Sequence, residues 1–310
     1  MRSSNGNERS GRTGLVVAPR DPDVMRCLQC GHLYARTACD HCGDRPVREG
    51  GFAAFAPALA RRTSGYENEY FLELGQVEAH HFWFRERRRL ILAMLKRYCP
   101  SMRSFLEIGC GTGQTLAAVH ACFPRVRLVG SEILSAGLGL AAQRVPGAEL
   151  VQMDARNIPY VDEFDAIGAF DVLEHIDDDL AVLGQMRAAL DRGGTLLLTV
   201  PQHPWLWSAT DEYSRHVRRY DAAELHGKIA RAGFRVLRST SFVTLLLPLL
   251  VLSRASDRLR ARDRERRVET DISPRLNRVL GAIQRAEVAL LETGLSLPVG
   301  GSRLVVAVRK

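Results

Sequence analysis

SFLEIGCGTG, residues 104–113, is the stretch of this chain that decides its fold. Its first five residues are mostly apolar and predict a short buried strand, which runs directly into Gly109, Gly111 and Gly113. Residues 114–122 then have the composition of a helix. Glycines at a strand-to-helix turn let the backbone approach a ligand closely, and the free amides at the helix N-terminus face that ligand. The stretch therefore predicts the ligand-binding turn of an α/β sheet.

Further apolar runs follow along the chain and alternate with helical segments. This alternation is typical of a parallel sheet wound by helices. We predict an α/β fold with a Rossmann-like, seven-stranded, mostly parallel sheet, helices on both faces, and a small N-terminal zinc-binding module. The strands predicted after the first are 126–130, 150–153, 164–170, 195–200, 234–243 and 302–308.

Acidic residues recur where the predicted strands end. Glu107 lies near the end of the first strand, Glu132 follows the second, and Asp154 and Asp171 follow the third and fourth. The carboxyl ends of the strands form the edge of an open α/β sheet where ligands bind. The glycine spacing is GxGxG rather than the GxGxxG of dinucleotide enzymes, and a carboxylate at Glu107 repels a pyrophosphate but attracts ammonium and sulfonium groups. These residues therefore favour S-adenosylmethionine over a dinucleotide.

The ordered motifs resemble those of class I S-adenosylmethionine-dependent methyltransferases (EC 2.1.1.-) over roughly residues 66–310. They are Glu107-Ile-Gly-Cys-Gly-Thr-Gly113, Glu132, Asp154-Ala155, Asp171-Val-Leu-Glu-His175 and Arg192-Gly-Gly194. The resemblance implies methyl transfer from this cofactor. It also implies that Gly109, Gly111 and Gly113 line the methionine and ribose portion, that Glu132 holds the ribose, that Asp154 and the backbone of Ala155 meet the adenine, and that Asp171 lies beside the cofactor.

An aromatic and basic segment, residues 80–87 (HHFWFRER), precedes the first strand. It is similar to the leading segment of a bacterial methyltransferase subgroup often found near genes for cell-surface sugars and lipid carriers. In that interpretation Trp83 and Arg87 help to cover the cofactor. An aromatic helix face packed on the sheet, with exposed arginines, explains the same residues.

Two CxxC pairs, residues 27–30 and 39–42, are separated by a short loop. Two such turns complete the tetrahedron that Zn²⁺ prefers in structural sites, and a glycine follows each pair, where positive φ is useful. Residues 25–48 are too few to fold on apolar burial, so metal binding would supply the folding free energy. A redox CxxC is the alternative, but the thioredoxin-like setting that it needs is missing from the pattern. We expect structural Zn²⁺ on Cys27, Cys30, Cys39 and Cys42.

The acceptor side of the predicted site has fewer candidate residues than the cofactor side. Methyl transfer is an in-line displacement, so a base is needed only where the acceptor must lose a proton. His175 is the candidate catalytic residue because it lies just beyond the fourth strand; a histidine that caps the following helix is the alternative. His203 and the segment 211–220 follow the fifth strand, where this fold usually builds its acceptor pocket.

The chain is basic, with a formal net charge of +8, and arginines cluster at 85–89, 215–219 and 254–267. Such a balance suits an anionic partner, a phospholipid surface or nucleic acid. The apolar run 245–252 next to the last cluster predicts a peripheral membrane contact through 242–267, although a buried lid or a dimer contact explains it equally well. Because every apolar run is too short to span a bilayer, we expect a cytoplasmic protein that contacts the inner face of the membrane.

The composition, 46% hydrophobic in 310 residues, allows one large core and a small appendage. We expect a disordered tail (1–24), a zinc ribbon (25–48), a linker (49–65) and a methyltransferase domain (66–310) with an insert at about 244–300. The leading hypothesis is a methyltransferase for a small-molecule or lipid-linked acceptor of a cell-surface sugar pathway.

Two other functions remain open. An RNA methyltransferase would use the zinc module and the basic surface to bind RNA, but its Asn-Pro-Pro-Tyr-like motif is missing after the fourth strand. A non-catalytic docking protein is the third hypothesis.

Overall fold

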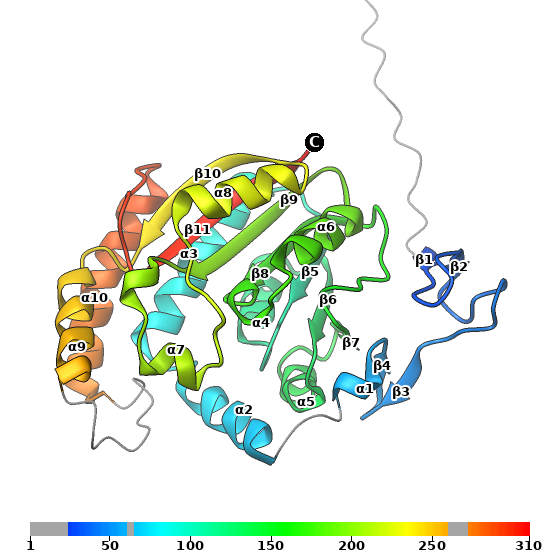
Figure 1. Cartoon of the computed structure of the whole chain (residues 1–310), viewed down its shortest axis with the longest axis horizontal. Coiled ribbons are helices and arrows are strands. Elements are labelled where there is room, and N and C mark those ends of the chain that lie inside the picture. Colours follow the sequence, from blue (N-terminus) through cyan, green and yellow to red (C-terminus); the bar gives the residue numbers. More distant parts are fainter. Residues whose placement is uncertain (1–23, 61–64, 260–271) are drawn as a thin grey trace, which may run out of the picture.

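The computed structural model describes residues 24–60, 65–259 and 272–310. Most of the expected N-terminal tail and the arginine-rich residues 260–267 lie outside the described residues, as do residues 61–64 of the expected linker. The described chain forms one large sheet flanked by helices and a separate two-stranded sheet near its N-terminal end (Figure 1).

The large sheet has nine strands in the order β10-β11-β9-β8-β5-β6-β7-β4-β3. Strands β5 to β9 run parallel, and β11 is antiparallel to both of its neighbours. The seven strands from β10 to β7 confirm the predicted Rossmann-like, mostly parallel sheet. Their bounds are β5 (Ser104–Ile108), β6 (Arg127–Glu132), β7 (Glu149–Gln152), β8 (Phe164–Phe170), β9 (Leu190–Pro201), β10 (Phe234–Phe242) and β11 (Ser302–Arg309).

Two short strands, β3 (Val47–Glu49) and β4 (Phe52–Ala54), extend the sheet beyond β7. They form an antiparallel hairpin, and β4 pairs in parallel with β7 through Ala53 and Ala54. The Gln152 side chain adds hydrogen bonds to the backbone N and O of Ala56, at 3.0 and 2.9 Å. Most of this hairpin lies in the segment expected to be a linker. Three-residue strands carry almost no pattern of their own, and pairing with β7 is what stabilises them.

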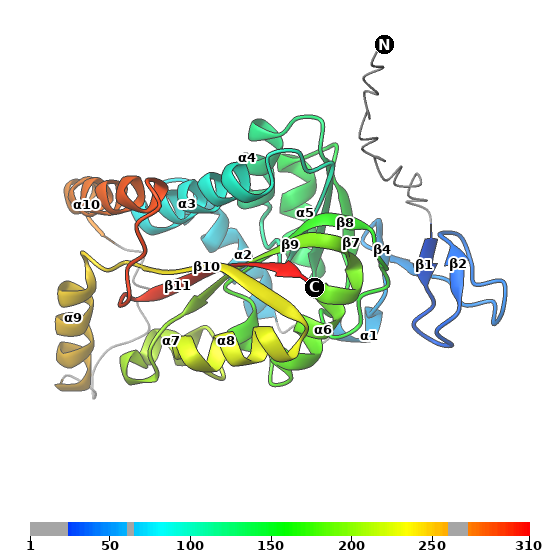
Figure 2. The same cartoon turned by 90° about the horizontal axis from the view of Figure 1, so that it is seen from above.

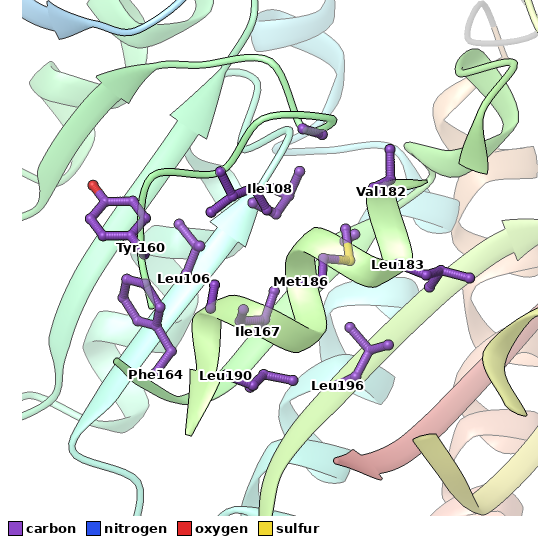
Figure 3. Packing of buried hydrophobic residues seen from close by; sticks show 14 of the residues in the cluster. Leu106, Ile108, Tyr160, Phe164, Ile167, Val182, Leu183, Met186, Leu190 and Leu196 are labelled. Atoms are coloured by element: carbon purple, nitrogen blue, oxygen red, sulfur yellow. The ribbon is translucent and has the colours of Figure 1, made fainter. Parts of the chain in front are cut away.

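Helices cover both faces of the sheet, and alternate strand residues point to opposite sides. Leu106 packs with the helices α6 and α8, while its neighbour Phe105 packs with α3, α4, α5 and α10. Figure 3 shows the first layer, in which Leu106 and Ile167 of the sheet face Met186 of α6.

The helix bounds are α1 (Pro57–Ala60), α2 (Gly65–Val77), α3 (Phe82–Tyr98), α4 (Gln114–Cys122), α5 (Ser135–Arg144), α6 (Asp179–Ala189), α7 (Ala209–Tyr213), α8 (Ala222–Arg231), α9 (Leu247–Leu259) and α10 (Pro274–Glu292), with 3-10 turns η1 (Leu173–His175) and η2 (Pro204–Leu206).

The N-terminal module contains the antiparallel strands β1 (Val24–Arg26) and β2 (Leu33–Ala35). It contacts the chain that follows β7: the Arg26 amide donates to the Pro159 carbonyl at 2.7 Å, and its guanidinium donates to the Ile158 carbonyl at 3.0 Å. Arg36 forms an ion pair with Glu149 at 2.7 Å. The module therefore rests on one end of the main sheet, opposite α9 and α10 (Figure 2).

The predicted insert between β10 and β11 contains α9 and α10. Helix α10 packs along α3, where the Asn277 side chain accepts a hydrogen bond from the Phe82 amide at 2.8 Å. Buried Glu287 accepts from the amides of Thr244 and Leu245, at 2.8 and 2.7 Å, which fixes the start of the insert. Among the helices of the described segments, none combines the length and apolar character needed to cross a bilayer.

Candidate active site

The glycine-rich turn between β5 and α4 is packed so tightly that no side chain fits at Gly109 or Gly113. Gly109 and Gly113 have φ of 69° and 80°, which only glycine adopts readily. A Cβ on Gly109 would lie 2.5 Å from Val172 Cγ2, and one on Gly113 would lie 2.8 Å from the Ala141 backbone. The turn therefore combines a left-handed backbone with direct packing, and it leaves the N-terminus of α4 facing the carboxyl edge of the sheet.

Glu132 and Glu107 lie at this edge, on neighbouring strands. The Glu132 carboxylate accepts hydrogen bonds from the amides of Gly111, at 3.0 Å, and Ile133, at 2.8 Å. Glu107 is 3% exposed, and within the described chain its buried Oε2 has no hydrogen-bond partner. Burial raises the pKa of both carboxyls, that of Glu107 well above its usual range, and the charges of Glu78 and Glu132 add to the shift of Glu107 while Arg87 opposes it. Two buried carboxylates at neighbouring strand ends form a site that a cationic ligand would stabilise.

Asp154 follows β7 at the same edge, and Ala155 beside it is buried. The Asp154 carboxylate accepts hydrogen bonds from the Arg156 amide at 2.9 Å and from its guanidinium at 2.8–3.0 Å. Sequence analysis did not predict this local clamp. It fixes the Asp154 side chain at the rim of the sheet edge.

Asp171 follows β8 in a left-handed conformation with φ of 58°. Its carboxylate accepts a hydrogen bond from Thr199 Oγ1 at 2.9 Å and forms a close ion pair with Arg87 of α3. The Arg87 guanidinium lies 4.5 Å from the centre of the Trp83 ring. Arg87 and Trp83 of α3 therefore lie beside the end of β8.

Some polar residues of this region were missed by sequence analysis. Buried Glu78 accepts a close hydrogen bond from the Thr112 hydroxyl and lies 3.9 Å from the Arg144 guanidinium. Thr112 lies inside the glycine-rich turn, so this contact ties α2 to the turn. Glu78 lies at the end of an ordinary helical pattern, and only knowledge of the helix packing identifies it.

A second group of polar side chains lies just beyond β8, where Glu174 and His175 of η1 meet His216. Glu174 is completely buried, which together with the charge of Asp171 raises its pKa well above the usual value, against the effect of Arg87. His175 lies at the surface of the group, where desolvation and the neighbouring His216 lower its pKa to about 4. The His175 ring is therefore neutral at pH 7.

A family model described as a methyltransferase domain matches residues 79–239, just over half of the chain. The chain belongs to the S-adenosylmethionine-dependent methyltransferase family. The match contains the glycine-rich turn and all the strand-end acids described above, and it confirms the family that the sequence motifs resembled.

Two curated relatives are named as methyltransferases, one of them with trans-aconitate as its acceptor. The chain is 27% identical over 159 residues to a probable S-adenosylmethionine-dependent methyltransferase of Mycolicibacterium smegmatis, covering 50% of this chain and 60% of that protein. It is 29% identical over 172 residues to a trans-aconitate 2-methyltransferase of Paracidovorax citrulli, covering 53% and 64%. The chain thus spans less than two thirds of the length of each relative.

A solved methyltransferase shares the fold. Phosphoethanolamine N-methyltransferase 2 of Haemonchus contortus, in complex with S-adenosyl-L-methionine, superimposes with a TM-score of 0.54 and 19% sequence identity, covering 86% of this chain and 62% of that chain. At this identity the likeness establishes the class I fold.

The family domain is accompanied by the four-cysteine cluster of the N-terminal module. The four sulfurs lie within 4.8 Å of one another, with Cys27 and Cys42 Sγ, and likewise Cys30 and Cys39 Sγ, 3.6 Å apart. Zn–S bonds of about 2.3 Å in a tetrahedron place sulfurs about 3.8 Å apart. The turns are closed by hydrogen bonds from the glycine after each pair to the carbonyl of the first cysteine, at 2.9 and 2.8 Å. The cluster therefore fits Zn²⁺.

Proposed function

We propose that this protein transfers the methyl group of S-adenosylmethionine to a small-molecule or lipid-linked acceptor. The observation that carries the proposal is the buried, unpaired Glu107 carboxylate oxygen beside the glycine-rich turn. A cofactor with an ammonium and a sulfonium group would supply a positively charged partner for this oxygen. Family membership supports the same cofactor.

Each predicted residue has a role in this proposal. Glu107 attracts the positively charged methionine end, and Glu132 accepts hydrogen bonds from the ribose hydroxyls. Asp154 accepts from the adenine amine, and Asp171 with Arg87 closes the site on the side of α3. The remaining contacts come from backbone, namely Gly109, Gly111, Gly113 and Ala155.

His175 is the proposed catalytic residue on the acceptor side. It follows Asp171 by four positions, and its pKa of about 4 leaves a neutral ring nitrogen available at pH 7. The electrostatic influence of Asp171 on His175 supports a position near the cofactor. In this role the ring accepts a proton from the accepting atom or orients the lone pair of that atom through a hydrogen bond.

The four-cysteine cluster is proposed to hold a structural Zn²⁺. Four thiolates saturate a tetrahedral ion and leave no position for a substrate. The module buries Met25 and Tyr34 against Tyr160 of the main domain, so its fold also supports the chain after β7. In this proposal the zinc acts on stability and not on the methyl transfer itself.

A lipid-linked acceptor is favoured by the surface of the insert. Leu249 and Leu252 of α9 are 53% and 65% exposed, and Val279 of α10 is 57% exposed. An open groove of about 880 Å³ between α3 and α10 is lined by basic side chains that include Arg88 and Arg285. Exposed apolar side chains of α9 and α10, together with a basic groove along α3 and α10, suit the interface of an anionic membrane and support peripheral contact there.

The proposed cofactor is tested by isothermal titration of the zinc-loaded protein with S-adenosylhomocysteine. The wild type should bind it, and Glu132→Ala should bind about 10–100-fold more weakly, because hydrogen bonds to a charged group are lost. Glu292→Gln, which changes a partly buried carboxylate at the end of α10 that pairs with Arg89, is the control and should bind normally. A wild-type protein that binds neither this compound nor S-adenosylmethionine contradicts the proposal.

The acceptor class is tested with radiolabelled S-adenosylmethionine and separated lipid, small-molecule and RNA fractions. Label in the lipid or small-molecule fraction is expected. Label confined to RNA would support the alternative and contradict this one.

Membrane contact is tested by sedimentation with vesicles of phosphatidylglycerol. Leu249→Ser with Leu252→Ser should reduce the bound fraction. Leu72→Ser on α2, where the leucine is 56% exposed, is the matched control and should leave it unchanged. Equal sedimentation of all three proteins would remove α9 from the proposal.

A further inference from the structure

Glu174 is a carboxylate without a partner in the interior. Its relative exposure is 0%, and within the described chain neither of its oxygens has a hydrogen bond to another residue. The backbone fixes it in place, because the Val217 amide donates to the Glu174 carbonyl at 2.8 Å and the Tyr220 hydroxyl donates to the Leu173 carbonyl at 3.3 Å. A buried polar group that is held away from water and left unpaired is costly. Something other than the protein is needed to satisfy it.

Two imidazole rings converge on this carboxylate. One ligand atom each from Glu174, His175 and His216 lie within 4.8 Å of one another. The rings of His175 and His216 meet edge to face, with their centres 4.7 Å apart and their planes at 78°. Two ring nitrogens and one carboxylate oxygen thus lie close enough together to bind one ion.

Both rings are also anchored from outside the group. His216 Nδ1 lies 2.9 Å from Asp211 Oδ1, and Asp211 is itself held by the Arg219 guanidinium at 2.8 Å and the Ser208 hydroxyl at 3.0 Å. The His175 ring hydrogen-bonds to backbone of the 214–215 turn. An outer carboxylate or carbonyl on one ring nitrogen directs the other nitrogen inward, which is the arrangement found around metal-bound histidines.

We propose that Glu174, His175 and His216 bind a divalent first-row transition ion. Imidazole and carboxylate together suit such ions. Metal–ligand bonds of about 2.0–2.2 Å place the donors about 3.0–3.5 Å apart, so small side-chain rotations close the site. Three protein ligands leave at least one coordination position open.

The proposed ion deepens the proposed function and rests on it: His175 then acts on the acceptor through the bound ion instead of directly on its proton, and the ion determines which acceptors fit. The group adjoins Asp171, whose charge acts on both Glu174 and His175. An acceptor hydroxyl on the open position loses its proton to solvent water more readily, because the ion stabilises the oxygen anion. That oxygen then forms a bond to the methyl carbon while the C–S electrons return to sulfur, giving an O-methyl product and S-adenosylhomocysteine. The substrate class is an acceptor with an oxygen ligand.

The experiment counts bound metal in the full chain. After equilibrium dialysis against micromolar Zn²⁺ and removal of loosely bound ions, the wild type should hold two zinc ions, one on the cysteines and one on the proposed site. Glu174→Gln and His216→Ala should each hold one, and Cys39→Ser should hold one on the remaining site. His226→Ala, which alters a partly buried histidine of α8 outside the group, should hold two.

X-ray absorption at the zinc edge of Cys39→Ser identifies the ligands directly. Nitrogen and oxygen ligands with two imidazoles are expected. One zinc in the wild type, or two in both Glu174→Gln and His216→Ala, overturns the proposal. The wild-type count and this spectrum decide it even if the Glu174 and His216 variants do not fold. Because neither measurement uses cofactor, failure here is distinct from failure to bind S-adenosylhomocysteine.

Discussion

The four cysteines of the N-terminal module and the Glu174, His175 and His216 group are two ligand clusters built in opposite ways. The cysteines lie within 16 positions of one another in a segment with three-residue strands, so their geometry is local. The second group joins η1 with the segment after α7 in the main domain and is held by a large sheet. In the first case the metal organises the chain; in the second the chain organises the ligands. The comparison predicts that metal loss unfolds the module but spares the main domain.

The largest effect is expected for Cys39→Ser. Three remaining thiolates hold Zn²⁺ far more weakly, and a module of this size has little apolar burial to replace the lost binding energy. Amide hydrogen exchange should become fast in residues 24–44 and stay slow in β5 and β8. Protected amides in the module after complete zinc removal would contradict the statement that the metal organises this part of the chain.

The substitution Asp211→Asn tests whether the chain itself positions the ligands of the Glu174, His175 and His216 group. The substitution removes the negative charge that orients His216, and loss of such an outer ligand typically weakens metal binding about 10–100-fold. Zinc affinity of the Cys39→Ser protein with and without Asp211→Asn measures this directly. Unchanged affinity would mean that Asp211 serves the fold alone.

Gly43→Ala tests the local geometry of the cysteine module. Gly43 has φ of 76°, so alanine is expected to cost about 1–2 kcal/mol, although a Cβ there would meet no atom within 4 Å. The zinc affinity of the module should fall by about 5–30-fold. Gly139→Ala, in helix α5 with equally open space, is the control and should leave it unchanged. An equal response of both variants would remove backbone strain as the cause.

The smallest effect is expected for Arg26→Ala, which removes contacts between the two regions. Arg26 binds the Ile158 carbonyl four positions after Asp154, the proposed adenine contact. Loss of this hydrogen bond should weaken S-adenosylhomocysteine binding by a few-fold, in line with about 1 kcal/mol for one such bond. Arg45→Ala, an arginine outside the strands of the same module, provides the comparison, and the titration should show no change for it.

The parts of the structure that the sequence predicted are those with a local cause. The strands from Ser104–Ile108 to Ser302–Arg309 were predicted because strands of a sheet that is covered on both faces are nearly continuous apolar runs. The convergence of Glu107, Glu132, Asp154 and Asp171 on one edge follows from the parallel order alone. Their roles in binding remain proposals.

Other features depend on tertiary packing that no local pattern encodes. The meeting of Glu174 with His216 depends on the path of the loop after β9, which the Val217 amide fixes. The clamp of Arg156 on Asp154 depends on a side-chain conformation. Strands β3 and β4 depend on the free edge of β7, because their own residues are too few to specify a strand.

The hairpin of β3 and β4 has a practical consequence for solubility. A parallel sheet that ended at β7 would present unpaired amides and carbonyls to other molecules, and such edges promote self-association. The hairpin covers this edge and ends in β3, a three-residue strand that carries Arg48 and Glu49. A shortened protein that begins near residue 66 would lose this cover and is expected to aggregate, whereas one that begins before Val47 keeps it.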